Sequence, residues 1–296
     1  MSRADIMIKL KYALRFLPDK MYLKLYFYMT LKRKLDFDHP KTLNEKLQWL
    51  KFNDRTPLHS LVSDKYAVRE YIKQELGEEY LVPLIGKWET AEEIDFDSLP
   101  QQYVLKCTHD SGGLVICRDK TSLDQDEAIK KLKKSLSRKF YYVGREWQYK
   151  NIKPLVICEE LLLDQAGNTP ADYKISCFNG KADNVMVCTG RFTKDGVKFY
   201  FFDRQWNFLP YNKGDEKLPA DFTLPKPDNL EEMFQIADKL SKPFYYARID
   251  LYNIDGKIYF SEITLCPNSG FDSDITYETD KLFGEKLHIP YGLSEK

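Results

Sequence analysis

Residues from Thr42 onward have the clearest helical pattern of the chain. Leu43, Leu47 and Leu50 recur at intervals of three and four positions and so fall on one face of a helix. Thr42 stands ahead of this run with Glu45 three positions later, which is the pattern of a capping box at a helix N-terminus. The sequence therefore predicts a helix that begins directly after Thr42.

Elsewhere the apolar residues form short runs that predict strands and further helices. Because strands and helices mix without a regular βαβ alternation, we expect an α+β fold with mainly antiparallel sheets. The proline-containing stretch Asn212–Asn229 is expected to be a loop. Helices are expected at Asp64–Leu76, before Gly77, and at Leu123–Lys139 and Leu230–Leu240. Strands are expected at Tyr103–Cys107, Leu114–Cys117, Leu155–Glu159, Tyr173–Phe178, Asn184–Cys188, Lys198–Phe202, Tyr245–Leu251 and Lys257–Ile263.

The N-terminal segment Met1–Lys34 combines apolar residues with a strong positive charge. It holds nine Lys and Arg residues against Asp5 and Asp19, a net charge of +7 (9 − 2). A basic, aromatic-rich helical stretch of this kind can lie on an anionic membrane surface. A helix packed on the body of the protein with its charges in water would have the same pattern. Peripheral membrane contact and a purely structural role therefore both stay open.

The composition as a whole narrows the class of protein. Basic and acidic residues balance at 45 each, which argues against nucleic acid as a partner. The six cysteines form no Cys-x-x-Cys pair and lie mostly in apolar runs, as reduced core thiols of a cytosolic protein do. No apolar run approaches the roughly 18 residues that a membrane span needs, and no secretory signal is visible. We expect a cytoplasmic location.

A lysine inside an apolar strand is the first candidate for chemistry. Val104 and Lys106 fall on one face of the expected strand Tyr103–Cys107. A lysine so placed needs an anionic partner or a route to solvent. The two glycines of Ser111-Gly112-Gly113 permit backbone N–H groups to approach a phosphate closely. Taken alone, the same loop is more typical of a plain hairpin turn.

An acidic hairpin is the second candidate. Asp250 and Glu262 stand on adjacent expected strands that are joined by a turn around Asp255-Gly256. Mg²⁺ in nucleotide sites is usually held by one or two carboxylates, and phosphate oxygens complete its coordination. The pair of acids therefore suits a magnesium site. An edge hairpin with solvated acids is the alternative.

The two carboxylates meet only if this hairpin departs from a regular two-residue turn. Successive residues of a strand alternate faces, so a regular turn would place Asp250 and Glu262 on opposite faces. We therefore expect an odd-length or bulged turn between Tyr252 and Ile258. Such a turn would pair Asp250 with Phe260 and would place Arg248 opposite Glu262.

These motifs occur in an order that resembles the ATP-grasp superfamily. More closely, the chain is similar to the TupA-like ATP-grasp family of polysaccharide-biosynthesis clusters, from about His39 to Phe271. The order is Lys106 with its glycine loop, Val156–Leu162, Asp172-Tyr173-Lys174, and then Arg248-Ile249-Asp250 with Glu262. The most specific segments are Lys41–Leu50, Leu105–Gly113, Gly144–Trp147, Asp172–Lys174 and Cys177–Gly180.

The resemblance implies an ATP-grasp fold, in which two α+β lobes hold ATP between them. We expect a helical N-terminal segment at residues 1–60 and a nucleotide-binding lobe at residues 61–161. The C-terminal lobe with the metal-binding hairpin would follow at residues 162–296. Lys106 and Asp250 should then face one cleft.

The resemblance also implies roles at the reacting end of ATP. Lys106 and Lys174 would contact the phosphates as fixed charges. Asp250 and Glu262 would hold Mg²⁺. Arg248 would stabilise the transferring phosphoryl group or the acyl-phosphate adduct.

The remaining implied contacts surround the rest of the nucleotide. The loop Ser111-Gly112-Gly113 would cover the phosphates. Asp172 or Asp164 would hold the ribose. An inter-lobe segment would read adenine through its backbone and line the adenine pocket, and its residues are Glu159, Glu160, Leu161 and Leu162.

Some positions of the implied site stay open. Many ATP-grasp enzymes have Glu-x-Asn with the Asn as a metal ligand, but Thr264 takes that place here, so Asn268 or a water would complete a second metal site. Arg145 would bind a substrate carboxylate or a diphosphate through its guanidinium fork, or else form a structural salt bridge with Glu146. Arg191 is a weaker candidate of the same kind.

The activity that the resemblance implies is ATP-dependent carboxylate–amine ligation. The γ-phosphoryl group of ATP would pass to a carboxylate, and an amine would then displace phosphate from the acyl phosphate to leave an amide. The carboxylate would belong to a uronic-acid glycan of a capsule or O-antigen, or to an amino acid. A glycosyltransferase, an ATP-grasp kinase and a nucleotide-sensing adaptor are the alternatives. The two phosphate lysines argue against the first, and the intact set of lysines and carboxylates argues against the last.

Overall fold

A computed structural model describes residue 8 and residues 11–190 and 196–290 of the chain. Its N-terminal part is helical and consists of α2 (Asp19–Leu31), α3 (Leu43–Asn53), α4 (Pro57–Ser63) and α5 (Val68–Glu75). The predicted capping box is confirmed, because the Thr42 side chain accepts a hydrogen bond from the Glu45 backbone and the Glu45 side chain bonds the backbone of Thr42. Among the described residues, no helix is both long and apolar enough to cross a membrane.

The helix predicted at Asp64–Leu76 begins later than expected. The Asp64 carboxylate accepts hydrogen bonds from the backbone N–H groups of Tyr66 and Ala67, which ties residues 64–67 into a turn ahead of α5. An Asp side chain that bonds the backbone in this way competes with helix formation. The predicted stop is confirmed, since Gly77 follows the helix with φ +119°.

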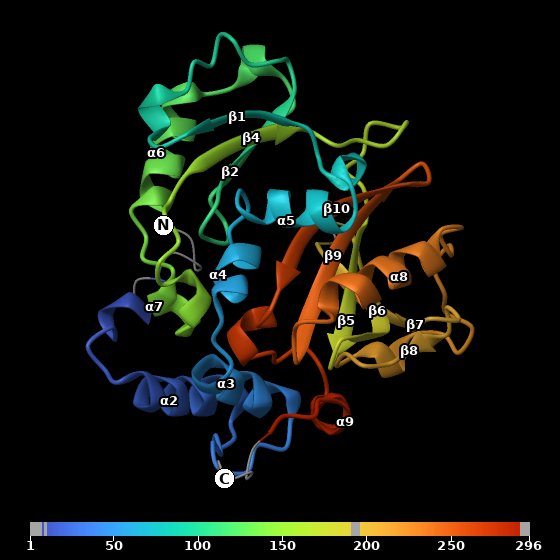
Figure 1. The fold of residues 1–296 in the computed structure, drawn as a ribbon. Coiled ribbons are helices and arrows are strands. Elements are labelled where there is room, and N and C mark those ends of the chain that lie inside the picture. The colour runs from blue at the N-terminus through green and yellow to red at the C-terminus, as the bar shows by residue number, and fades with distance from the viewer. Residues whose placement is uncertain (1–7, 9–10, 191–195, 291–296) are drawn as a thin grey trace.

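A four-stranded antiparallel sheet forms the upper part of the molecule in Figure 1. Its strands, in spatial order, are β1 (Leu84–Trp88), β4 (Val156–Glu160), β2 (Tyr103–Cys107) and β3 (Leu114–Cys117). Helix α6 (Gln125–Leu136) covers one face and buries Ala128 and Leu132 against Leu105 and Val115. The short helix α7 (Tyr141–Gly144) then leads toward the N-terminal helices.

A six-stranded antiparallel sheet forms the second lobe. Its strands, in spatial order, are β10 (Lys257–Thr264), β9 (Tyr246–Ile254), β5 (Asp172–Phe178), β6 (Lys181–Thr189), β7 (Lys198–Asp203) and β8 (Phe208–Leu209). Helix α8 (Leu230–Ser241) packs on one face, whereas α3 and α9 (Tyr277–Lys286) pack on the other. The predicted α+β fold with mainly antiparallel sheets is confirmed.

Strand alternation in the second lobe separates its core from its chemistry. Ile175 and Ile249 point to the α8 face and are fully buried in the largest core cluster. Lys174 pairs with Asp250 across the β5–β9 ladder, and Ser176 pairs with Arg248. These polar residues therefore share the opposite face of the sheet.

Candidate active site

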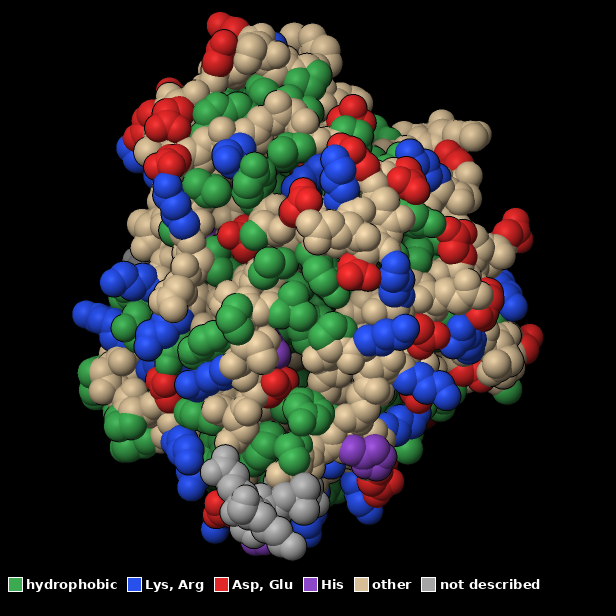
Figure 2. Space-filling model, viewed as in Figure 1, with side chains coloured by type: hydrophobic (Ala, Val, Ile, Leu, Met, Phe, Trp, Pro, Cys, Tyr) green, Lys and Arg blue, Asp and Glu red, His purple; other side chains and the backbone are tan. Residues whose placement is uncertain are grey.

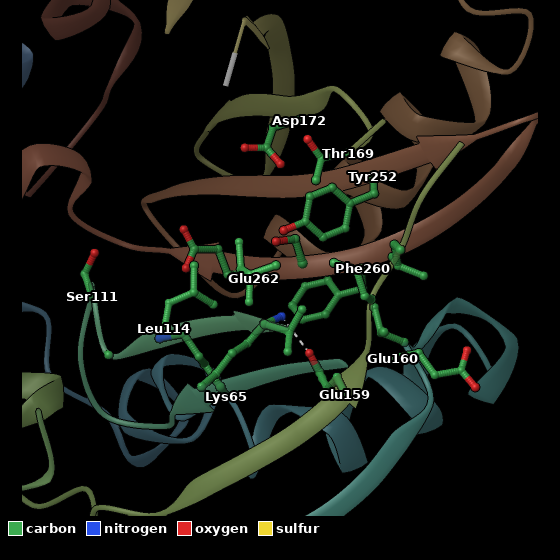
Figure 3. A pocket seen from close by; sticks show the side chains of 18 of the residues that line it. Lys65, Ser111, Leu114, Glu159, Glu160, Thr169, Asp172, Tyr252, Phe260 and Glu262 are labelled. Carbon is green, nitrogen blue, oxygen red and sulfur yellow. Dashed lines mark hydrogen bonds and ion pairs between the residues drawn. The ribbon is translucent and has the colours of Figure 1, made fainter. Parts of the chain in front are cut away.

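A cavity of about 300 Å³ lies between the two sheets. Strands β2, β3 and β4 supply one wall, and β5, β9 and β10 supply the other. Figure 3 shows side chains from both lobes pointing into the same space, with Glu262 and Tyr252 on one side and Leu114 and Glu159 on the other. The cavity is thus enclosed by residues that are far apart in the sequence.

One part of this cavity is apolar. Val104 and Ile116 of the four-stranded sheet line it together with Leu161 and Leu162, which follow β4. Val104 shares its strand face with Lys106, as predicted, while Leu105 points to the α6 core. An apolar compartment next to fixed cations suits a flat ring attached to an anionic chain.

Lys106 is held by a carboxylate from the neighbouring strand. Its Nζ lies 2.6 Å from Glu159 Oε2, and the other oxygen of Glu159 accepts a hydrogen bond of 2.7 Å from Arg69. Burial lowers the pKa of Lys106, but Glu159, Tyr252 and Glu262 together raise it by more, so the net pKa is raised. Lys106 therefore keeps its positive charge at neutral pH inside the cavity.

The loop Ser111-Gly112-Gly113 is a tight connection at the edge of the cavity. Gly112 has φ +106°, a left-handed conformation that favours glycine. The Gly113 N–H donates to the Asp110 carboxylate at 3.2 Å, and Lys65 Nζ donates to the Asp110 carbonyl at 2.6 Å. The loop is thus anchored from both the four-stranded sheet and the helical segment, and it lines the cavity.

Three charged side chains of the second lobe form one buried network. Asp250 is only 1% exposed and accepts two hydrogen bonds of 2.7 Å from Arg248 and a further one from Lys174. Burial raises the pKa of Asp250, but Arg248 and Lys174 outweigh burial and hold the pKa below its ordinary value. Burial lowers the pKa of Lys174, but Asp250, Asp172 and Glu262 together raise it by more, so the net pKa of Lys174 is raised. All three groups are charged at neutral pH.

The hairpin that carries the two acids corrects the predicted register. Its turn is a regular two-residue turn, with Ile254 opposite Lys257 and with Asp255 and Gly256 at φ +51° and +85°. These angles belong to the type I′ turn that Asp-Gly favours. The predicted bulge between Tyr252 and Ile258 is therefore wrong.

A bulge does occur, but farther along β10. The register shifts between Phe260 and Glu262, so that Ser261 is the extra residue and Glu262 stands directly opposite Asp250. The predicted pairing of Asp250 with Phe260 is wrong, and Arg248 faces Thr264 rather than Glu262. The two carboxylates nevertheless lie on one side of the hairpin. Glu262 lines the cavity, while Asp250 is buried beside it, behind Lys174.

The oxygen atoms near the hairpin fit a magnesium ion only in part. No group of three or more His, Cys, Asp or Glu residues in the described part of the chain is arranged to hold a metal. Thr264 Oγ1 donates to Glu262 and accepts from Arg248, both at 3.2 Å, so it links the network. Glu262 lines the first cavity, whereas both oxygens of Asp250 already accept hydrogen bonds from Arg248 and Lys174. A Mg²⁺ ion held by these two carboxylates would therefore compete with the two cations for Asp250, and its other ligands would have to come from a bound nucleotide or water.

A second cavity of about 240 Å³ opens on the other side of Lys174, which lines both cavities. It lies between the polar face of the six-stranded sheet and the helices α3 and α9. Arg248 lines it, and so do Asn268 and Asp272 from the segment around the 3₁₀ turn Pro267–Gly270. The rest of its wall is mixed, with the aromatic residues Phe199, Phe201, Tyr246 and Phe283 beside aliphatic and polar ones. Asn268 thus lies on this cavity and is not among the residues that line the first.

Other predicted residues lie apart from the cavities or at their edge. Arg145 is 1% exposed, its Nε lies 3.2 Å from Asp19, and its guanidinium lies 4.4 Å from the ring centre of Tyr22. It lines neither cavity, and its ionic partner is Asp19 rather than Glu146. The substrate-binding interpretation of Arg145 therefore loses its geometric basis.

Of the two ribose candidates, Asp172 lines the first cavity. Asp164 builds a turn instead, because its carboxylate accepts backbone hydrogen bonds from Ala166 and Asn168. Arg191 lies outside the described residues.

Two cationic residues of the first cavity were not foreseen. Lys65 lies in the turn between α4 and α5, Arg69 lies in α5, and both line the first cavity. Arg69 donates to Glu159 and to the Val82 carbonyl, so it joins α5 to the four-stranded sheet. No spacing in the sequence could reveal this, because only the folding of the helices onto the sheet brings these residues to the cavity.

Comparisons with known proteins agree with the resemblance. A family model described as TupA-like ATPgrasp matches residues 45–288. Among solved structures, D-alanine–D-alanine ligase from Bacillus anthracis is similar at 16% identity and a TM-score of 0.47, over 82% of this chain and 70% of that chain. The structure of the same ligase with ATP has 18% identity and a TM-score of 0.42, over 77% of this chain and 65% of that chain.

A phosphoribosylamine–glycine ligase from Thermotoga maritima has 18% identity and a TM-score of 0.39, over 72% of this chain and 50% of that chain. No curated protein matches this chain. The solved structures are too distant to add to the argument from the site.

Proposed function

This chain belongs to the TupA-like ATP-grasp family, and on that basis we propose that it is an ATP-dependent carboxylate–amine ligase. The observation that carries the proposal is the first cavity, where Lys106 from one lobe meets Lys174 and Glu262 from the other. We keep the division into a helical segment (1–60), a nucleotide-binding lobe (61–161) and a C-terminal lobe (162–296) as part of this proposal.

ATP would occupy the first cavity. Its adenine suits the apolar compartment of Val104, Ile116, Leu161 and Leu162, and its ribose suits Asp172. The phosphates would lie between Lys106 and Lys174 under the loop Ser111–Gly113. Mg²⁺, held by Asp250 and Glu262, would neutralise phosphate charge there.

The carboxylate substrate would occupy the second cavity. Lys174 lines both cavities and Arg248 lines the second, so a carboxylate held by Arg248 would be near the γ-phosphate of ATP. A guanidinium matches a carboxylate with two parallel hydrogen bonds. The aromatic side chains in its wall and the amides of Asn212 and Asn268 suit a compact ring with hydroxyl groups, such as a uronic acid.

The reaction then follows from charge. A carboxylate oxygen attacks the γ-phosphorus, an O–P bond forms, and ADP leaves with the electrons of the broken bond. Lys106, Lys174 and Arg248 stabilise the charge that spreads over the phosphoryl oxygens. An amine next attacks the carbonyl carbon, inorganic phosphate leaves, and the nitrogen loses a proton to give the amide. We place this chemistry in the modification of a capsule or O-antigen glycan.

The proposal includes a cytoplasmic location with peripheral contact to an anionic membrane through the basic N-terminal segment. All six cysteines are buried and free, which suits a reducing compartment. A membrane location would suit a glycan carried on a lipid.

The test uses an oxygen label. The protein is incubated with ATP, Mg²⁺, an amine panel and carboxylates labelled with ¹⁸O, which include uronic acids, uronic-acid glycans and amino acids. Ligation predicts that ADP release depends on both co-substrates and that one ¹⁸O moves into inorganic phosphate. A phosphorylated product without amine dependence would indicate a kinase. A rise in melting temperature with nucleotide sugars but not with ATP would refute the ligase proposal and favour a glycosyltransferase.

A further inference from the structure

Helix α2 has apolar side chains on both of its faces. Tyr22, Leu23 and Phe27 point into the protein and are fully buried. A surface helix of a globular protein normally presents polar residues to solvent. The outward face of α2 instead carries Met21, Leu25, Tyr28 and Met29, which are 57%, 43%, 57% and 46% exposed. We call these four residues the α2 stripe. No other described part of the chain covers it.

Positive charges border the α2 stripe. The single acid between residues 15 and 34 is Asp19, and its carboxylate is held by Arg145 and by the Tyr141 hydroxyl. Figure 2 shows hydrophobic and basic side chains next to one another at the lower left, where Figure 1 places α2. The exposed basic residues of this stretch are Arg15, Lys20, Lys24, Lys32 and Lys34.

Charge alone would not distinguish α2 from other helices. Helix α6 also exposes several lysines, including Lys130 and Lys131, but its apolar residues Ala128 and Leu132 are buried against the sheet. Its outward face is therefore an ordinary solvated surface. What sets α2 apart is that an exposed apolar stripe is bordered by exposed cations, of which Lys20 and Lys24 lie 5.6 Å and 6.0 Å from the ring centres of Phe52 and Phe37.

We propose that the outward face of α2 lies on an anionic phospholipid bilayer, with the helix parallel to the membrane plane. The α2 stripe would enter the boundary between headgroups and acyl chains, while the flanking lysines contact the phosphate groups. Exposed Phe16, just ahead of the helix, would add to the inserted area. A second copy of the chain is a poor occupant, because the cations of two copies would face each other.

This surface also has a structural link to the second cavity. The inner face of α2 packs on Phe271, whose ring lies 4.7 Å from that of Tyr26 and 6.3 Å from that of Phe27. The next residue, Asp272, lines the second cavity. If the chain is the proposed ligase, a carboxylate on a lipid-anchored glycan would reach the cavity from the bilayer surface. The membrane contact itself does not rest on the ligase function.

Vesicle flotation of the full chain tests the proposal. The probes are vesicles of phosphatidylcholine mixed with phosphatidylserine and vesicles of phosphatidylcholine alone. Binding is expected only to the anionic vesicles, and only at low ionic strength, because the Debye length falls from about 30 Å at about 0.01 M to about 3 Å at about 1 M. Leu25→Ser with Met29→Ser, and separately Lys20→Glu with Lys24→Glu, should each reduce the partition coefficient about tenfold or more.

The matched control is Lys130→Glu with Lys131→Glu on α6, which makes the same charge change away from the stripe and should leave most of the binding intact. Circular dichroism checks that each variant is folded, and ATP binding in the same samples should match that of the parent protein. No binding of the parent to anionic vesicles at low ionic strength would overturn the proposal. An equal loss in the α6 control would also overturn it, and so would self-association that Leu25→Ser with Met29→Ser abolishes in the absence of lipid. If the parent protein binds anionic vesicles but does not turn over ATP, only the ligase function would be contradicted.

Discussion

Replacing Glu262 by glutamine should reduce magnesium-dependent turnover and leave the fold intact. The Glu262 side chain is 40% exposed, and its carboxylate contacts Arg248 at 3.4 Å and Thr264 at 3.2 Å. A glutamine oxygen can accept both hydrogen bonds, and a partly exposed ion pair is worth at most about 1 kcal/mol. The melting temperature should therefore fall by no more than about 2–4 °C.

The expected loss of activity is larger than this loss of stability. Removing one preorganised electrostatic contact to a transition state typically costs about 10²-fold or more in kcat, which is about 2.7 kcal/mol or more. The expected loss of transition-state stabilisation, about 2.7 kcal/mol, exceeds the expected loss of folding stability, about 1 kcal/mol. A metal ligand and a merely structural carboxylate therefore give different results. The carboxylate-to-amide change also removes a negative charge, so the Mg²⁺ concentration that gives half of the maximal rate should rise.

The assay measures initial rates of ADP release over a series of Mg²⁺ concentrations, with the co-substrate pair that the labelling experiment identifies. Glu278→Gln is the matched control, because Glu278 is an exposed glutamate on α9 that lines neither cavity. Turnover of Glu262→Gln within about threefold of the parent at limiting Mg²⁺ would refute the metal assignment. A fall in melting temperature well beyond that of the control would show that Glu262 acts on the fold instead.

Three further results are expected. Lys106→Met should weaken ATP binding about tenfold or more in calorimetry, since it removes a partly buried positive charge from the first cavity while Arg69 still pairs with Glu159. Gly113→Ala should lower the melting temperature and ATP affinity, because its new Cβ would lie 2.7 Å from Asp110 Oδ1 and 2.8 Å from Cys107 Cβ. Overpacking of this kind costs about 1–3 kcal/mol. Gly112→Ala is the control that separates backbone strain from collision, because Gly112 has φ +106° but open space around it. The lowered pKa of Asp250 stabilises the folded protein above the ordinary pKa of an Asp, 3.8, and this stabilisation should be lost as pH falls through the folded-state pKa. In urea melts, Asp250→Asn should therefore lose less stability below pH 3.8 than the parent does.

Sequence reasoning located the elements whose apolar runs end at clear turn signals. The bounds of β2 and β3 agree with the prediction, because Tyr103–Cys107 and Leu114–Cys117 are separated by a polar, glycine-containing loop. Strand β1 was not predicted, since Gly86 interrupts a short run whose pairing with β4 is itself irregular. Helix α9 was not predicted either, because it lies beyond the last strong apolar run.

The register of the acidic hairpin shows where such reasoning stops. Asp255-Gly256 is a strong signal for a regular turn, yet the resemblance required both acids on one face. The conflict can be solved by a bulge at any position of either strand, and nothing in the residue type of Ser261 marks it as the extra residue. Alternation of faces indicates that a bulge exists but does not locate it.

Arg145 shows a different limit. Its neighbours in the sequence, Glu146 and Trp147, suggested either a substrate site or a local ion pair. In the structure its partner is Asp19, in a helix far away along the chain, while Glu146 accepts a hydrogen bond of 2.6 Å from Ser269. Partners of a buried arginine are set by how distant helices pack, and one sequence does not contain that information in readable form.

The charge network around Asp250 explains why Glu262, and not Asp250, is the informative position. Asp250 is fully buried and bonds both Lys174, which lines the two cavities, and Arg248, which lines the second. Removing its charge would leave Lys174 only Asp172 at 3.7 Å and Arg248 only Glu262 at 3.4 Å as acidic partners. Loss of one partner of a buried ion pair typically costs several kcal/mol, and it would move the groups that are proposed to face ATP and the carboxylate. Loss of activity in Asp250→Asn would therefore follow whether or not Asp250 binds a metal. Glu262 contacts the same network only at its exposed edge. A change at Glu262 therefore alters the cavity, while Asp250 still holds Arg248 and Lys174 in place.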